Sequence, residues 1–163
     1  FLGICYGMQM AIIEFARNKL NLKKATSSEF DKKGLAIIGL MNEWNKDGKK
    51  IKGTDKNLGG TMRLGSYDAK LLKNSMIQKI YGKNLIKERH RHRYEVNIAF
   101  KEKFEKNGMH FSGLSPDGNL PEIIELKNHP WFIGVQFHPE FKSRPLAPHP
   151  LFSSFIKASK NHK

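Results

Sequence analysis

A cysteine between two glycines stands near the start of the sequence, in the run Gly3-Ile4-Cys5-Tyr6-Gly7. This spacing is typical of a nucleophile on a sharp strand-to-helix turn, where glycines allow the strand and the helix to approach closely. Backbone N–H groups at the helix start can stabilise an oxyanion and lower the pKa of a thiol. We therefore predict Cys5 as a nucleophile, with the Tyr6 N–H as one oxyanion contact. The alternative is a small buried cysteine beside an ordinary turn.

A histidine and a glutamate near the other end of the chain supply the base that such a thiol needs. His138 and Glu140 flank Pro139 at the end of an apolar run. Residues at i and i+2 of an extended chain project to the same side, and chemistry in open α/β sheets gathers at the carboxyl ends of strands. We expect His138 to act as general base and acid, oriented by Glu140. The alternatives are a metal pair, although two ligands alone make a poor zinc site, and a solvated loop histidine.

The segments that carry these residues predict a single α/β unit. An apolar run at 1–4 is followed by apolar residues at helical spacing from Met8 to Phe15, which indicates a strand, a turn and a helix. The nearly continuous apolar run at 132–137 is typical of a strand covered on both faces, and it ends at His138. Further strands are predicted at 36–41, 94–98, 109–114 and 120–126, helices at 100–107 and from Pro150, a turn at 115–118, and an exposed loop at 45–57.

Composition sets limits on the class of protein. The chain has 163 residues, of which 39% are hydrophobic, and this is enough for one compact domain. Its single cysteine excludes an internal disulfide framework. The formal charge of +14 and the basic cluster at 89–93 support a second hypothesis, a nucleic-acid-binding module. Against it, most of the excess is lysine scattered through loops, without an aromatic-interleaved sheet motif.

Two of these motifs resemble a known family. Residues 3–9 (GICYGMQ) and 137–140 (FHPE) are similar to the class I (triad) glutamine amidotransferases. Segments 14–18 (EFARN), 60–65 (GTMRLG), 88–97 (ERHRHRYEVN), 129–132 (HPWF) and 136–141 (QFHPEF) narrow the resemblance to the glutaminase domains of CTP synthases. The resemblance implies an α/β fold of the class I glutamine amidotransferase (flavodoxin-like) type, with a mixed sheet and flanking helices, incomplete at its N-terminus. Residues 1–163 would form a partial glutaminase domain, and an N-terminal synthase domain would precede them.

The resemblance also implies roles for individual residues. Cys5 would be the nucleophile, His138 the general base and acid, and Glu140 its orienting group. L-Glutamine would be held by six residues: Tyr6, Gly7, Met8, Gln9, Glu29 and Arg93. From its surroundings alone, Glu29 is a surface acid after a Ser-Ser turn. Segment 60–65 resembles a lid loop involved in control by GTP, with Arg63 as the regulatory residue; the alternative is an exposed hairpin segment.

The implied reaction hydrolyses L-glutamine and supplies ammonia for the ATP-dependent amination of UTP to CTP. This segment would need no cofactor or metal, whereas ATP, Mg²⁺ and UTP would belong to the missing synthase domain and GTP would be the activator. The family further implies a homotetramer when complete and a cytoplasmic location, with no membrane or nucleic-acid partner. A glutamine amidotransferase domain of another ligase is the alternative that keeps this chemistry and changes the ammonia acceptor.

Overall fold

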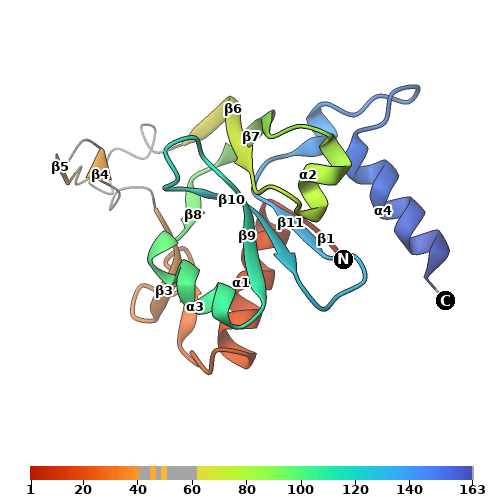
Figure 1. Cartoon of the computed structure of the whole chain (residues 1–163). Coiled ribbons are helices and arrows are strands. Elements are labelled where there is room, and N and C mark those ends of the chain that lie inside the picture. Colours follow the sequence, from red (N-terminus) through yellow and green to blue (C-terminus); the bar gives the residue numbers. More distant parts are fainter. Residues whose placement is uncertain (41–44, 47–48, 51–61, 163) are drawn as a thin grey trace.

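The computed structural model describes residues 1–40, 45–46, 49–50 and 62–162 (Figure 1). Its main layer is a six-stranded mixed sheet in the order β1-β11-β10-β9-β6-β7. Strand β1 pairs in parallel with β11, and the other neighbours are antiparallel. The strands are β1 Leu2–Ile4, β11 Ile133–Val135, β10 Pro121–Leu126, β9 Met109–Leu114, β6 Arg63–Leu71 and β7 Leu85–His92.

A smaller three-stranded sheet lies beside helix α1 in the order β2-β3-β8. These strands are β2 Ala25–Ser27, β3 Leu35–Leu40 and β8 Tyr94–Val96, and the short pair β4 Asn45–Lys46 with β5 Lys49–Lys50 forms a separate hairpin. Because β7 leads through one bend into β8, the chain passes directly from the edge of the large sheet into the small one. The helices are α1 Tyr6–Asn18, α2 Met76–Tyr81, α3 Lys101–Lys106 and α4 Pro150–Asn161, with 3₁₀ turns η3 Ile98–Phe100 and η4 Pro139–Phe141.

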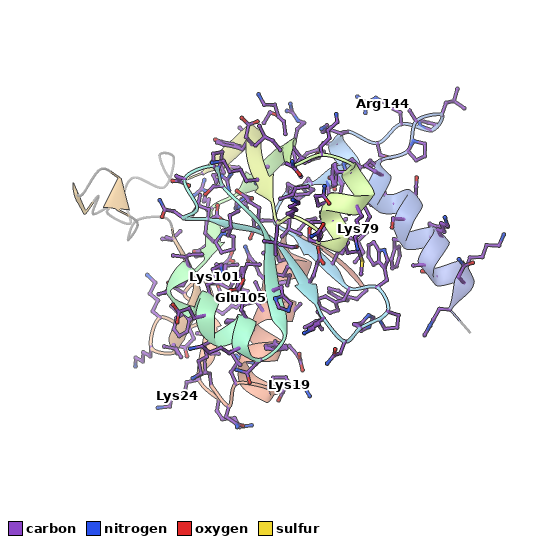
Figure 2. The ribbon with its side chains drawn as sticks, in the orientation of Figure 1. Lys19, Lys24, Lys79, Lys101, Glu105 and Arg144 are labelled. Atoms are coloured by element: carbon purple, nitrogen blue, oxygen red, sulfur yellow. The ribbon has the colours of Figure 1, made fainter. Side chains whose placement is uncertain are left out.

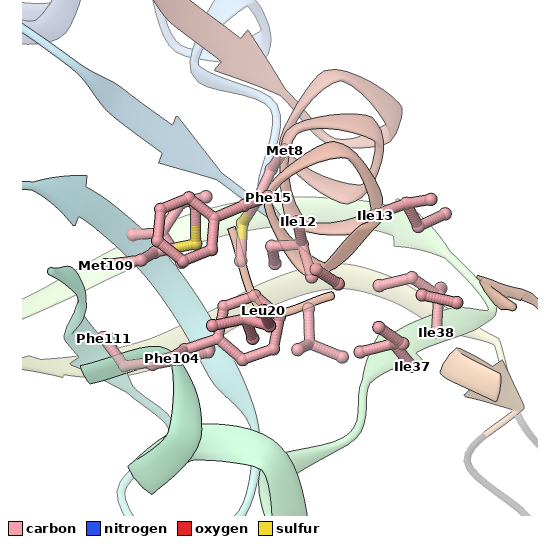
Figure 3. Close-up of a cluster of buried hydrophobic side chains, with 14 residues drawn as sticks. Met8, Ile12, Ile13, Phe15, Leu20, Ile37, Ile38, Phe104, Met109 and Phe111 are labelled. Carbon is pink, nitrogen blue, oxygen red and sulfur yellow. The ribbon is translucent and has the colours of Figure 1, made fainter. Parts of the chain in front are cut away.

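Both faces of the large sheet are covered by helices (Figure 1). Ile123 and Ile124 are neighbours on β10, and each is fully buried in a different hydrophobic cluster because successive strand residues point to opposite faces. The cluster around Ile124 contains residues of α1, α3 and β3, and Figure 3 shows Phe15 and Phe104 stacked within it. The cluster around Ile123 contains residues of α2, α4 and β6.

Most of the predicted elements are confirmed. The predicted strands correspond to β1, β3, β8, β9, β10 and β11, and the predicted helices to α1, α3 and α4. The turn at 115–118 also forms, because the Gly118 N–H donates to the Ser115 carbonyl at 2.8 Å. The predicted loop at 45–57 contains β4 and β5, and its other residues lie outside the described part. In the part of the chain that the structure describes, no helix is long and apolar enough to cross a membrane.

Besides β4 and β5, the elements that were not predicted are β2, β7, α2 and most of β6. Strand β7 alternates regularly between exposed and buried residues, but the buried ones include Glu88, His90 and His92 instead of aliphatic side chains. A search for alternating hydrophobic residues therefore misses it. Helix α2 has only six residues, and its clearest signals are local: the Ser75 hydroxyl accepts from the Gln78 N–H, and Gly82 ends the helix at φ 63°.

Candidate active site

Cys5 occupies the sharp turn between β1 and α1. Its backbone has φ 50° and ψ −101°, a strained conformation for a residue with a side chain. The Cys5 N–H donates to the Val135 carbonyl at 2.7 Å, which continues the parallel pairing of β1 with β11. The prediction that Cys5 and His138 follow the carboxyl ends of two strands is therefore confirmed, and those two strands are direct neighbours.

The two glycines around Cys5 have different roles. A Cβ at Gly3 would lie 2.9 Å from the carbonyl carbon of Gly7 and 2.8 Å from the Phe1 ring. The predicted close approach of strand and helix is thus real at Gly3. A Cβ at Gly7 would meet nothing within 4 Å, so the prediction that Gly7 must be small for the same reason is wrong.

This difference gives a matched pair of variants. We expect Gly3→Ala to lower the unfolding midpoint and displace Cys5, because its methyl group has to push strand and helix apart. The expected cost is about 1–3 kcal/mol. Gly7→Ala should leave the fold as stable or slightly more stable, since alanine favours a helix by about 1 kcal/mol over glycine. Thermal unfolding of both variants tests this, and equal losses would contradict the steric argument.

His138 and Glu140 form the second part of the site. The Nδ1 atom of His138 lies 2.6 Å from Oε1 of Glu140. The His138 N–H donates to the Arg89 carbonyl at 2.8 Å, and its ring stacks on Phe141 with centroids 5.0 Å apart. Among the described residues, the buried Nε2 atom has no hydrogen-bond partner. With Nδ1–H donating to the carboxylate, Nε2 keeps its lone pair and can accept a proton.

The environment of the Cys5 thiol differs from the prediction. Burial raises the pKa of the thiol, and the charges of Glu95 and Glu140 act in the same direction. Hydrogen bonds from the Tyr6 N–H and the Gln136 amide oppose this, but they do not outweigh burial. The expectation of a lowered thiol pKa at the helix start is therefore wrong for the protein without substrate, because desolvation dominates.

A chain of side-chain amides leads from the thiol into the interior. Gln136, the residue before Phe137, directs Nε2 at the Cys5 sulfur at 3.6 Å. Its Oε1 accepts from Nε2 of Gln9 at 3.1 Å, and the same nitrogen of Gln9 donates to the Tyr94 carbonyl at 2.9 Å. Gln136 was not among the predicted site residues, although it belongs to the segment that carried the resemblance.

A buried ionic cluster lies deeper in the sheet. Nη1 of Arg63 is 3.1 Å from Oε1 of Glu95 and 2.7 Å from Oε1 of Glu122, and all three side chains are almost fully buried. The guanidinium also lies over the Tyr67 ring at 4.5 Å. Burial raises the pKa of both carboxyl groups, although Arg63 opposes the shift. Arg63 is thus an interior residue of β6, and the alternative of an exposed hairpin is wrong at this position; residues 60 and 61 lie outside the described part.

Two histidines connect this cluster to the β7–β8 bend. Nδ1 of His92 is 3.2 Å from the Tyr94 carbonyl, which can only accept, and Nδ1 of His90 is 2.8 Å from Nε2 of His92. With both rings neutral, each would donate through Nδ1, His90 to His92 and His92 to the Tyr94 carbonyl. Burial and the nearby Arg63 charge lower the pKa of His90 to about 2 and that of His92 to about 3. No individual role was predicted for these histidines, which belong to the basic cluster at 89–93 and to segment 88–97 of the resemblance.

The predicted glutamine-binding residues fall into two groups. Tyr6 is half exposed, and its ring meets Phe30 edge-to-face at 6.0 Å, which places the turn carrying the exposed Glu29 beside the start of α1. Arg93 lies partly buried in the bend between β7 and β8. Met8, in contrast, is completely buried in the core. Gln9 is also buried and uses its amide N–H groups internally, so neither side chain reaches the surface.

The residues of the basic cluster at 89–93 do not share one face of the molecule. On β7, Arg89 and Arg91 point outward, whereas His90 and His92 are buried, so the cluster at 89–93 is divided between two faces. Figure 2 shows other cations on separate elements, including Lys19, Lys79, Lys101 and Arg144. Lys101 pairs with Glu105 at 2.6 Å. Among the described residues, no group of three or more histidine, cysteine or acidic side chains is arranged to hold a metal ion.

Comparisons with known proteins agree with this architecture. The chain is 88% identical over its whole length to a CTP synthase of Pelagibacter ubique and 60% identical over 160 residues (98% of the chain) to that of Zymomonas mobilis. The chain spans only 30% and 29% of these relatives. A solved structure described as the glutaminase domain of Trypanosoma brucei CTP synthase with bound acivicin matches with a TM-score of 0.84 at 36% identity, covering 99% of this chain and 60% of that one. The predicted fold class is thereby confirmed.

A family model carries the assignment. The model described as glutamine amidotransferase class-I matches residues 1–158, which is nearly the whole chain. The strained Cys5 turn and the His138–Glu140 pair lie within the matched region. The chain therefore belongs to the class-I glutamine amidotransferase family.

Proposed function

We propose that the chain is the glutaminase part of a CTP synthase and hydrolyses L-glutamine through Cys5, His138 and Glu140. One observation supports the proposal: β1 and β11 pair in parallel, and a strained cysteine follows one of these strands while a histidine hydrogen-bonded to a carboxylate follows the other. Ammonia released here would pass to a synthase domain that binds ATP, Mg²⁺ and UTP and forms CTP. The similarity to CTP synthases supports that acceptor over another ligase.

The reaction begins at the thiol. His138 takes the Cys5 proton through Nε2, and the sulfur attacks the side-chain amide carbon of glutamine. The tetrahedral oxyanion receives a hydrogen bond from the Tyr6 N–H at the start of α1. His138 returns the proton to the nitrogen, the C–N bond breaks, and ammonia leaves a γ-glutamyl thioester. Water, activated by His138, then attacks the thioester and releases glutamate and the thiol.

The raised pKa of the resting thiol fits this order of events. Because burial and Glu140 disfavour an isolated thiolate, the proton leaves Cys5 as the base and the substrate come into place. In the proposed pocket, Glu29 and Arg93 would bind the charged α-ammonium and α-carboxylate groups of glutamine. Tyr6 and Gly7 would contribute through the backbone at the start of α1. Residues 1–163 would be part of a longer, cytoplasmic, tetrameric enzyme that GTP activates through segment 60–65, with Arg63 as the regulatory residue.

Labelling with a glutamine-like electrophile tests the proposal. An intact-mass measurement with a diazo-ketone analogue should give one adduct, located on Cys5, the single cysteine of this chain. Excess L-glutamine should suppress the adduct, and D-glutamine should not. A folded protein that forms no adduct, or one that L-glutamine fails to suppress, would refute the glutaminase assignment.

The role of Glu140 gives a separate prediction. Glu140→Gln should lower kcat for glutamine hydrolysis on the order of 10²–10⁴-fold with little change in KM, because the variant no longer fixes the tautomer of His138. Steady-state kinetics of glutamate release provide the measurement. Glu102→Gln, an exposed acid on α3, is the matched control. A rise in KM with unchanged kcat would mean that Glu140 binds substrate and does not orient His138.

A further inference from the structure

Gln136 has a side chain that the proposed triad does not use. It follows β11, is completely buried, and its N–H is fixed by the Glu122 carbonyl at 2.8 Å. The β1–β11 pairing ends with Ile4 aligned to Val135, and Cys5 and Gln136 are the residues that directly follow these two strands. The Gln136 side chain uses this placement to reach the sulfur at 3.6 Å.

The orientation of the Gln136 amide is determined by its partners. The Tyr94 carbonyl can only accept, so the Gln9 group that faces it at 2.9 Å must be the NH₂. The same NH₂ faces one end of the Gln136 amide at 3.1 Å, and that end must therefore be the oxygen. The remaining end of Gln136, facing Cys5, is then its NH₂. Reversing this amide would place two NH₂ donors together at the Gln9 contact.

We propose that Gln136 is a positioning residue for the nucleophile: its amide N–H holds the Cys5 sulfur and stabilises negative charge on it, and Gln9 fixes the amide in that orientation. The inference rests on the proposed glutaminase function, because it concerns the same sulfur. It adds a side-chain donor to the backbone donor at the helix start, and this donor comes from the residue after β11, in the segment that also leads to His138.

The chemistry requires such a donor. The thiolate is the attacking species, and it is also the leaving group when the thioester is hydrolysed. Burial, Glu95 and Glu140 all disfavour the negative sulfur, whereas the Tyr6 N–H and Gln136 favour it. Among the described residues, Gln136 is the one whose side chain donates a hydrogen bond to the sulfur. Removing that bond should therefore raise the pH at which the thiolate forms.

The experiment measures the rate of Cys5 alkylation against pH in the full-length protein, with peptide mapping to assign the label. Iodoacetamide is the probe, and protection by L-glutamine verifies the pocket. Gln136→Met keeps the side-chain volume and loses the donor. We expect it to raise the midpoint of the labelling rate against pH by about one pH unit and to slow labelling at pH 7 about tenfold. Gln136→Glu should shift the midpoint in the same direction and further, since it places an acceptor at the sulfur. Gln78→Met, which removes a glutamine amide from α2, should behave as the wild type.

Turnover provides a second readout. Glutamine hydrolysis by Gln136→Met should show a lower kcat with KM within about twofold of the wild type. Gln9→Met should give a smaller midpoint shift than Gln136→Met, because it only frees the amide to rotate. If wild-type Cys5 is labelled and protected but the Gln136→Met and Gln136→Glu midpoints equal that of the wild type, the inference is wrong and the glutaminase proposal stands. If wild-type Cys5 shows no glutamine-protected labelling, both are wrong.

Discussion

Replacing Cys5 with serine is expected to remove glutamine-dependent activity almost completely. The less acidic hydroxyl would have to be deprotonated in the same buried position, where burial already raises the pKa of the more acidic thiol. Losing the nucleophile of a comparable triad costs on the order of 10⁴-fold or more in kcat. Glutamate release by the full-length enzyme, followed at saturating glutamine, measures this loss.

The same variant separates the two proposed activities. CTP formation from added ammonium salts should stay within about twofold of the wild type in Cys5→Ser, because ammonia bypasses the glutaminase site. An equal loss of ammonia-dependent synthesis would mean that the substitution disrupts the fold and does not only remove the nucleophile. Retained glutamine hydrolysis would contradict the assignment of Cys5.

The second large effect is expected at Arg63, where stability should depend on pH. Arg63→Met removes the buried cation that pairs with Glu95 and Glu122, and breaking a buried pair from one side costs about 3–5 kcal/mol. Without Arg63, both acids must be neutral in the folded protein, so their folded pKa values rise further above the unfolded ones. A carboxyl group with a raised folded pKa binds more protons when folded, and its contribution to stability is therefore lost as the pH rises.

Denaturant unfolding at pH 5 and pH 8 tests this expectation. The free energy of unfolding that Arg63→Met loses relative to the wild type should be larger at pH 8 than at pH 5. The increase is about 1.4 kcal/mol for each pH unit over which the folded variant holds one more proton than the folded wild type. Arg144→Met, which removes an exposed arginine from the loop after η4, is the control and should show no such trend. An equal loss at both pH values would mean that the Glu95–Glu122 pair is not what Arg63 neutralises.

This placement changes how the proposed regulatory role of Arg63 has to be examined. An alanine at this position would weaken the interior of the sheet, and a reduced GTP response would then have two causes. Arg63→Lys keeps a buried cation and alters only the guanidinium contacts, including the one over Tyr67. It is therefore the better variant for measuring activation by GTP.

Much of the site could be predicted from the sequence because its signals are local. The glycine-flanked cysteine and the His138-Pro139-Glu140 run each need only a few consecutive residues, and apolar runs identified the strands that carry them. The contacts that support them are not local. Gln9 meets Gln136 across 127 positions of sequence, and Arg63 meets Glu122 from a different strand. Only the register of the sheets brings these polar residues together.

One strand could not be predicted because most of its buried residues are polar. Strand β7 buries Ile86 but also Glu88, His90 and His92, so three of its four buried positions carry no hydrophobic signal. Met8 was mispredicted in the opposite way: it lies in a segment that the resemblance assigns to substrate binding, but its side chain is buried in the core. The type of a residue thus indicated which chemistry its side chain can perform, but not whether that side chain points to the core or to the surface.

Strand β7 is the last strand of the large sheet, and such an edge invites pairing with another chain. Here the loop that carries His138 occupies main-chain acceptors of that edge: Arg89 receives the His138 N–H, and the Lys87 carbonyl receives Nζ of Lys142 at 2.6 Å. Lys87, Arg89 and Arg91 add positive charge along the outward side. The loop that positions the proposed catalytic base therefore also covers an edge at which another strand could add, and a change that lifts this loop is expected to lower solubility together with the proposed activity.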